Sequence, residues 1–224
     1  MSRVGGPDVV FGVFEFLRRL FGRRAVDPLA GLVPERTRLV VGLGNPGPEY
    51  AETRHNVGFR CVERLAQLSA AAWHDRRDFH CLVALISPED DTHLVLARPQ
   101  TFMNRSGTAV RAVLDTLGLA PGQCLIVYDD MDLPFGALRL RERGSPGTHN
   151  GMRSVVGSVG TDAVPRLRIG ISQASPGEAT SHVLSEFAPQ ERKAVDELVA
   201  RAADAALAWA INGAGVAMNR YNKM

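Results

Sequence analysis

Residues 38–47 read Arg38-Leu-Val-Val-Gly-Leu-Gly-Asn-Pro-Gly47, a run of β-forming residues that leads directly into a glycine turn. Further along the chain, short β-type runs alternate with segments of helical apolar spacing. The β-type runs lie at 81–86, 93–98, 124–128, 138–141 and 166–171, and the helical segments lie at 57–68, 106–117, 152–159 and from about Pro189 to Ala210, before Gly213. This alternation predicts an α/β fold: a single domain with a mixed, mostly parallel twisted sheet flanked by helices on both faces.

The N-terminal region does not share this alternation. Pro28 and Pro34 interrupt 22–37, which is typical of a linker. Residues 9–21 place apolar side chains at helical spacing with arginines late in the segment, the reverse of the charge order in a signal peptide. Two interpretations stay open: a mobile tail or misplaced start codon, or an amphipathic helix at 9–24 in weak contact with a membrane surface or a partner. Residues 1–36 are therefore assigned to an N-terminal extension and linker.

The bulk composition is that of an ordinary globular protein, with 45% hydrophobic and 22% charged residues and a net charge of +2. Any basic site must be local, because the overall charge does not indicate a nucleic-acid binder. The three cysteines, an odd number outside any Cys-x-x-Cys pair, are expected to be buried free thiols. No apolar run approaches the roughly 18 residues that span a bilayer. These features favour a cytoplasmic protein without a membrane span.

The glycine turn has a competing interpretation, because residues 42–47 formally match the Gly-x-Gly-x-x-Gly fingerprint of dinucleotide-binding proteins. Pro46 lacks the N–H that a pyrophosphate site needs, and it biases Asn45 away from the helical region. The acidic residue at the required distance, Glu63, falls inside the next helical segment rather than after a second strand. We therefore disfavour a nucleotide cofactor, and a purely structural turn remains the other alternative.

Short, hydrogen-bonding side chains gather at the predicted strand ends and loops. His55 lies in a polar segment after the glycine turn, and Asp129 follows the apolar strand at 124–128, at the edge where open α/β sheets bind ligands. A histidine paired with a carboxylate is held in one tautomer and becomes a stronger base, which suits the activation of water. The other residues of this kind are Asn45, Asn104, His149 and Asn150. Amide side chains can hold a carbonyl, an oxyanion or a water.

Several common hydrolytic motifs are missing from the sequence: Gly-x-Ser-x-Gly, His-Glu-x-x-His, zinc-spaced Cys/His clusters and the Gly-Lys-Ser/Thr phosphate loop. A water nucleophile with a histidine base remains. Arg139 and Arg141 alternate with leucines, and Arg166 and Arg168 alternate with apolar residues, so each strand is expected to present guanidinium groups on one face. Near the glycine-rich loop at 144–151, this arrangement favours a phosphate clamp over a solvated strand face.

With these residues in view, the sequence closely resembles the bacterial-type peptidyl-tRNA hydrolases, from about Leu39 to Asn222. Six segments carry the resemblance in order: Val41-Gly-Leu-Gly-Asn-Pro-Gly-Pro-Glu-Tyr50, Thr53-Arg-His-Asn-Val-Gly58, Arg98-Pro-Gln-Thr-Phe-Met-Asn-Arg-Ser-Gly107, Tyr128-Asp-Asp-Met-Asp-Leu-Pro134, Gly147-Thr-His-Asn-Gly151 and Arg166-Leu-Arg-Ile-Gly-Ile171. The terminal Ala217-Met-Asn-Arg-Tyr-Asn222 also fits. Residues 37–224 are therefore expected to form the catalytic domain.

The resemblance implies hydrolysis of the ester between a peptide and the 3′-terminal ribose of tRNA, which recycles peptidyl-tRNA lost from ribosomes. It implies that His55 is the general base and that Asp129 orients it. Arg141 and Arg168 would hold a phosphate of the tRNA 5′ end. The residues implied to surround the peptide, the water and the tetrahedral intermediate are Asn45, Tyr50, Met103, Asn104, His149 and Asn150. No metal or organic cofactor is implied, and the family is usually monomeric.

Two features depart from the family. Pro146 and Thr148 stand where the family commonly has small, flexible residues, which should stiffen the loop and affect substrate affinity more than chemistry. The N-terminal extension is not explained by the resemblance. The alternative function is a catalytically inactive RNA-binding protein on the same fold, and the intact set of histidine, aspartate and asparagine residues argues against it.

Overall fold

The computed structural model describes residues 27–89 and 91–222 and divides the chain into two compact units, Met1–Gly31 and Leu32–Met224. In the first unit, the described residues form a turn in which the Ala30 N–H donates to the Asp27 carbonyl (3.0 Å). The amphipathic helix hypothesised for 9–24 lies outside the described residues. The second unit holds every helix and strand described here.

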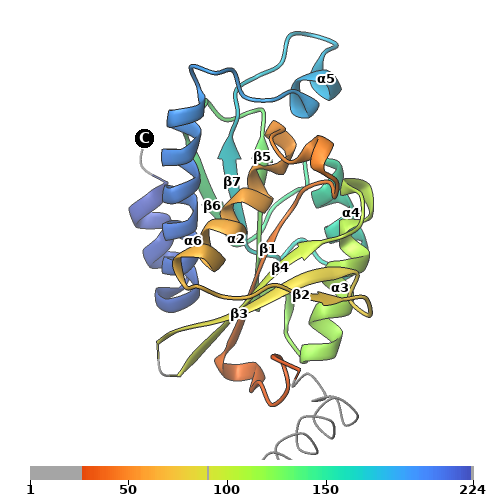
Figure 1. Cartoon of the computed structure of the whole chain (residues 1–224), viewed down its shortest axis with the longest axis vertical. Helices are drawn as coiled ribbons and strands as arrows, with labels where there is room; N and C mark the ends of the chain where they lie inside the picture. Colours follow the sequence, from red (N-terminus) through yellow and green to blue (C-terminus); the bar gives the residue numbers. More distant parts are fainter. Residues whose placement is uncertain (1–26, 90, 223–224) are drawn as a thin grey trace, which may run out of the picture. The chain divides into compact units, whose positions relative to one another are not determined.

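A seven-stranded sheet forms the centre of the second unit (Figure 1). Its strands are β1 (Thr37–Gly42), β2 (His74–Arg76), β3 (Cys81–Glu89), β4 (Thr92–Pro99), β5 (Cys124–Asp130), β6 (Leu138–Arg141) and β7 (Arg166–Gly170), in the order β2-β3-β4-β1-β5-β7-β6. The four strands β4, β1, β5 and β7 are parallel, whereas β3 with β2 at one edge and β6 at the other pair antiparallel. Parallel strands are buried on both faces, and residues 39–41 and 125–127 are accordingly buried and apolar.

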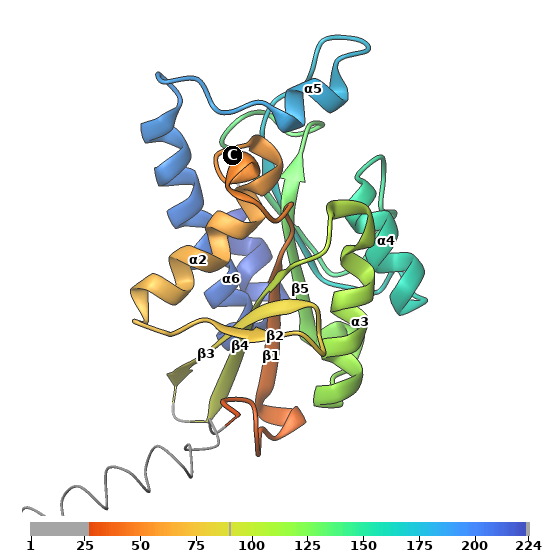
Figure 2. The same cartoon turned by 45° about the vertical axis from the view of Figure 1, so that its right-hand side comes forward.

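Helices cover both faces of this sheet (Figure 2). α2 (Val57–Leu68) and α6 (Arg192–Tyr221) lie on one face, and α3 (Ser106–Leu117) and α4 (Asn150–Val159) lie on the other. The short helix α5 (Ala179–Leu184) lies beyond the carboxyl ends of β5 and β7 (Figure 1). Single 3-10 turns occur at Pro34–Arg36, Pro48–Tyr50, Arg54–Asn56, Met103–Arg105 and Pro121–Gln123. The predicted fold class is confirmed.

Glycines let α2 lie directly on the sheet. A Cβ on Gly42 would lie 2.1 Å from the Gly58 carbonyl oxygen, and a Cβ on Gly58 would lie 2.4 Å from the Val127 carbonyl oxygen. A Cβ on Gly44 would lie 2.7 Å from the ring of Phe59. Because no side chain fits at these distances, two of the glycines of the turn serve the packing of α2 and of an aromatic ring. This packing accounts for them without a nucleotide.

The C-terminal helix differs from its prediction at both ends. It begins at Arg192 rather than at Pro189, because residues 189–191 form a separate turn closed by the Glu191 N–H and the Ala188 carbonyl (2.8 Å). Gly213 does break the helical backbone, with a φ of 81°, but the helix resumes and ends at Tyr221. β2 and α5 are unpredicted, since they are too short to show a periodic pattern. Among the described helices, none is long and apolar enough to cross a membrane.

Candidate active site

Two histidines converge on one buried carboxylate at the carboxyl end of β5. Asp129 is 1% exposed, and its Oδ1 lies 2.8 Å from His55 Nδ1 and 3.1 Å from His149 Nε2. His55 belongs to the turn before α2, and His149 caps the N-terminus of α4. Helices on opposite faces of the sheet therefore bring a histidine each to Asp129. The pair singled out from the sequence, His55 and Asp129, is in direct hydrogen-bond contact.

The surrounding hydrogen bonds define which nitrogen of each histidine carries the proton. The Met152 N–H donates to His149 Nδ1 (3.1 Å), so neutral His149 carries its proton on Nε2 and donates it to Asp129. His55 donates to the same carboxylate from Nδ1, which leaves Nε2 as an acceptor to which no described residue is bonded. Burial favours a raised pKa for Asp129, but the two histidines outweigh burial and hold the pKa below its usual value. Asp129 is therefore ionised at neutral pH.

Asn45 is tied to the histidine turn by the residue that follows His55. The Asn56 side chain accepts from the Asn45 N–H (2.8 Å) and donates to the Asn45 carbonyl (2.9 Å). The Asn45 side-chain oxygen accepts from the Met103 N–H (2.8 Å). Since the backbone and Oδ1 are both bonded, Nδ2 is the remaining donor, and it has no acceptor in the described part of the chain. The glycine turn thus presents one uncommitted amide donor on a fixed backbone.

A cavity of about 380 Å³ opens from the histidine cluster across the sheet. Its lining includes His55, Asp129, His149 and Asn150, and α5 contributes a wall. The floor is the face of β5, β7 and β6 that carries Tyr128, Arg168 and Arg141. The cavity therefore occupies a part of the sheet that α3 and α4 leave uncovered.

The arginines of β6 and β7 form cross-strand pairs, Arg139 with Arg168 and Arg141 with Arg166, but their environments differ. Arg166 is 2% exposed, and its guanidinium donates to the backbone carbonyls of Gly144, Ser145, Asp162 and Val164. This corrects the expectation that it presents its guanidinium group for binding, because that group is bonded to the glycine-rich loop at Gly144 and Ser145 and to the segment before β7 at Asp162 and Val164. Arg168 Nε is bonded to Asp130, while its terminal nitrogens face no acceptor among the residues described. Arg141 is exposed.

Met103 lies against the first turn of α4, close to His149. It is 5% exposed, in the turn that follows β4. A Cβ on Gly151 would lie 2.5 Å from Met103 Sδ and 2.9 Å from His149 Cε1, so these two side chains flank the first turn of α4 together. The structure thus brings Met103 to the cluster, although it does not line the cavity.

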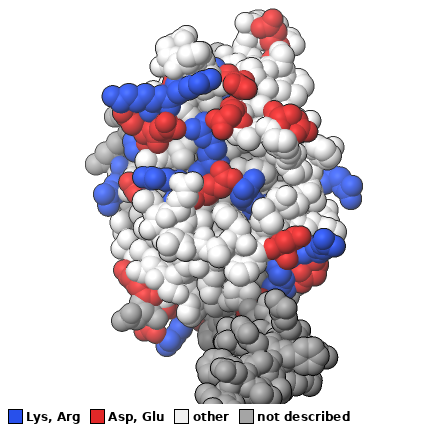
Figure 3. Space-filling model, in the orientation of Figure 1, with Lys and Arg blue, Asp and Glu red and all other residues white. Residues whose placement is uncertain are grey.

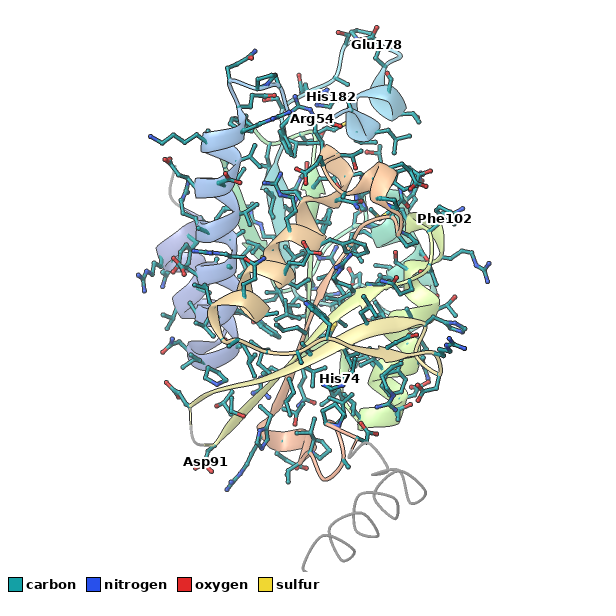
Figure 4. All side chains as sticks on the ribbon, viewed as in Figure 1. Arg54, His74, Asp91, Phe102, Glu178 and His182 are labelled. Carbon is teal, nitrogen blue, oxygen red and sulfur yellow. The ribbon has the colours of Figure 1, made fainter. Side chains whose placement is uncertain are left out.

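The outer residues of the predicted site are more exposed. Tyr50 and Phe102 contact each other edge to face with ring centres 6.3 Å apart, and Phe102, labelled in Figure 4, is 56% exposed. Asn104 and Asn150 are exposed, and only Asn150 of the two lines the cavity. The predicted residues therefore form two groups: those of the cavity, and those on the turns after β1 and β4.

Sequence reasoning missed Asn56, Arg54 and the bond between His149 and Asp129. Arg54 and Asn56 flank His55 directly, and that adjacency was the available signal for both. The spacing of His149 and Asp129 along the chain carries no such signal, because α4 and β5 meet only in the folded sheet.

Comparison with known proteins extends over nearly all of the described second unit. The family model for peptidyl-tRNA hydrolase matches residues 39–224. A peptidyl-tRNA hydrolase of Chloroflexus aggregans is 49% identical over 189 residues, covering 83% of this chain and 99% of that protein. One from Synechococcus elongatus is 45% identical over 194 residues, covering 84% and 93%. The crystal structure of the Acinetobacter baumannii peptidyl-tRNA hydrolase superposes with a TM-score of 0.78 at 35% identity, covering 86% of this chain and 97% of that one.

Proposed function

This chain belongs to the peptidyl-tRNA hydrolase family, and we propose that His55 is the base with which it hydrolyses the ester between a peptide and the 3′-terminal ribose of tRNA. The observation that carries the proposal is the bond from His55 Nδ1 to the buried Asp129 (2.8 Å). That bond leaves His55 Nε2 as a lone-pair nitrogen at the end of the cavity.

The reaction requires one proton to move twice. A water hydrogen-bonded to His55 Nε2 attacks the ester carbonyl carbon as its proton passes to that nitrogen. The tetrahedral intermediate then collapses, the bond to the ribose oxygen breaks, and His55 returns the proton to the leaving 3′-oxygen. Asp129 stays ionised throughout and stabilises the imidazolium that forms between the two steps.

The asparagines supply neutral donors for the peptide and the intermediate. Asn45 Nδ2 is an uncommitted donor on a fixed side chain, which suits the stabilisation of an oxyanion. Asn104 and Asn150 are exposed and directly follow Met103 and His149 in the chain, and they would bind the peptide backbone and the water. Tyr50, backed by Phe102, would close the outer side.

The arginines suit a phosphate of the tRNA 5′ end. Acidic and basic side chains are interspersed on the face that carries α2 and α6, so that face offers no continuous basic surface (Figure 3). In the cavity, Arg168 keeps its terminal nitrogens available while Asp130 holds its Nε, and exposed Arg141 lies on the neighbouring strand. Two guanidinium groups on one sheet face can bind a phosphate with charge-assisted hydrogen bonds.

The cluster is proposed to work without a metal. Ligand atoms of His55, Asp129 and His149 lie within 4.8 Å of one another, which is close enough to share an ion. The Met152 N–H occupies His149 Nδ1, however, so Nε2 carries the proton and has no lone pair for a metal. Unchanged activity after chelation would support this.

We also propose that residues 37–224 are the catalytic domain and that the protein acts as a monomer in the cytoplasm. Three free, buried cysteines suit a reducing compartment, and burial raises the pKa of Cys61 and Cys81 to about 12. Light scattering of the purified protein tests the monomer, and deletion of residues 1–36 tests the domain boundary by its effect on activity.

The test of the proposed base is release of peptide from an N-blocked aminoacyl-tRNA. His55→Ala should abolish turnover while tRNA binding persists, and full activity in that variant would remove His55 from its role. A single-turnover assay of the wild type also tests the alternative of an inactive RNA-binding protein, which predicts binding without peptide release.

A further inference from the structure

The three residues of the turn Arg54–Asn56 make contacts in three directions. His55 is bonded to Asp129, and Asn56 is bonded to the backbone of Asn45. Arg54 reaches away from both, toward the residues before α6. Both neighbours of His55 therefore anchor its turn, each to a different part of the fold.

The guanidinium of Arg54 is enclosed by the segment 185–191, the strap. Its Nη2 lies 2.6 Å from Glu191 Oε2 and its Nη1 lies 3.3 Å from Glu191 Oε1. Arg54 is 8% exposed, and its guanidinium carbon lies 4.5 Å from the centre of the Phe187 ring. The bond from Arg54 also keeps the pKa of Glu191 below its usual value. A two-pronged, largely buried pair is geometrically specific in a way that an exposed ion pair is not.

The strap is joined to the same turn through its backbone. The Arg54 N–H donates to the Ser185 carbonyl (3.0 Å), and Thr53 forms an antiparallel β-bridge with Glu186. Figure 4 shows Arg54 and His182, at the end of α5, on this same side of the molecule. The strap follows α5 directly, and α5 lines the cavity with Ala179, Thr180 and Val183.

We infer that Arg54 is a positioning residue for His55, held in place by Glu191 and Phe187 of the strap; this rests on the proposed role of His55 as the base. Arg54 does not line the cavity, so it acts through the backbone of its neighbour. His55 is aligned by a single 3-10 turn, and a displacement of about 1 Å at a reacting group costs on the order of a hundredfold in rate. The strap, which follows the cavity-lining helix α5 in the chain, thus also sets the alignment of the base.

The test compares Arg54→Gln, Arg54→Lys and Glu191→Gln in the peptide-release assay. Arg54→Gln and Glu191→Gln should lower kcat by on the order of tenfold to a hundredfold, with KM within about twofold of the wild type. Arg54→Lys keeps the positive charge but cannot make the two parallel hydrogen bonds of a guanidinium, so kcat should fall less in this variant than in Arg54→Gln. The proton that His55 shares with Asp129 should give a downfield NMR resonance that broadens or shifts in the two glutamine variants.

Arg192→Gln is the matched control, because Arg192 follows Glu191 in sequence but forms only an exposed, 4.0 Å pair with Glu186. Wild-type kcat in Arg54→Gln, or a rise of KM alone, would overturn the inference, as would an equal loss in the control. Should Arg54→Gln fail to fold, Glu191→Gln decides, since Glu191 is partly exposed. His55→Ala is run in parallel: activity in that variant contradicts the proposed function, whereas an inactive His55→Ala beside a fully active Glu191→Gln contradicts the positioning role alone.

Discussion

Replacing Asp129 with asparagine separates the chemistry of the site from its packing. The two side chains have nearly the same shape, so the 1% exposed position stays filled. The change falls on the single oxygen that accepts from His55 (2.8 Å) and His149 (3.1 Å). If the amide turns its NH₂ group toward His55, that histidine must carry its proton on Nε2 instead. The nitrogen that should take a proton from water is then already protonated.

The expected losses differ in size. With the amide oxygen toward the histidines, two charge-assisted hydrogen bonds become neutral ones, which weakens each by about 1 kcal/mol, and the loss is partly offset because no buried carboxylate needs desolvation. The folded state should therefore lose less than about 2 kcal/mol, a fall in Tm of no more than about 8 °C. The fall in kcat should be far larger, on the order of a thousandfold, because the base is weaker and partly in the wrong tautomer.

Single-turnover peptide release and thermal unfolding measure the two effects side by side. Asp115→Asn is the control, since Asp115 is an exposed carboxylate on α3 that pairs with Arg111 (2.7 Å) and does not line the cavity. A rate in Asp129→Asn within about threefold of the wild type would refute the reasoning. So would a rate loss of the same size in Asp115→Asn.

The same variant should be less sensitive to acid. The pKa of Asp129 lies below its usual value in the folded protein, so its stabilising effect is present above the unfolded pKa of roughly 4 and is lost as the pH falls toward the folded value. In Asp129→Asn the amide at this position takes up no proton as the pH falls. Its free energy of unfolding should fall less steeply than that of the wild type below about pH 4, and identical slopes would contradict this.

Three further predictions concern residues around the site. Gly58→Ala should destabilise the fold by about 2 kcal/mol or more, because its Cβ would lie 2.4 Å from the Val127 carbonyl oxygen; an unchanged denaturation midpoint would contradict it. Arg166→Met removes the donor to the Gly144 and Ser145 carbonyls, so hydrogen exchange in the 144–151 loop should rise, and unaltered exchange counts against a structural Arg166. Arg168→Gln should raise KM, leave kcat unchanged and lower the salt dependence of KM by about one phosphate contact; the same salt slope as the wild type would remove Arg168 from the phosphate site.

The fold was predictable because its signals are local and repeated. The apolar run at 124–128 and the helical spacing at 57–68 each identify an element within a few residues, and α2 has the predicted bounds. The C-terminal helix was harder, since its ends depend on the turn at Glu191 and on the packing that lets the helix resume after Gly213. Such features depend on distant parts of the chain.

The site was predictable as a set of residues but not as a set of contacts. Strand alternation correctly assigns Arg166 and Arg168 to one face, but it cannot distinguish a buried structural arginine from an available one. The tautomer of His149 depends on the Met152 N–H at the start of α4, which no spacing in the sequence reveals. The hydrogen-bond partner of each of these side chains is decided by which residues lie close to it in the folded structure.

The uncovered face of β5, β7 and β6 is a surface that bound substrate would cover, as a helix covers the rest of the sheet. Most α/β sheets of this kind are sandwiched between two layers of helices, and here a cavity stands where one layer stops. Bound tRNA and peptide would complete the sandwich over Tyr128 and Arg168. Bound substrate should then raise the free energy of unfolding by mass action, and release of the products uncovers this face of the sheet again.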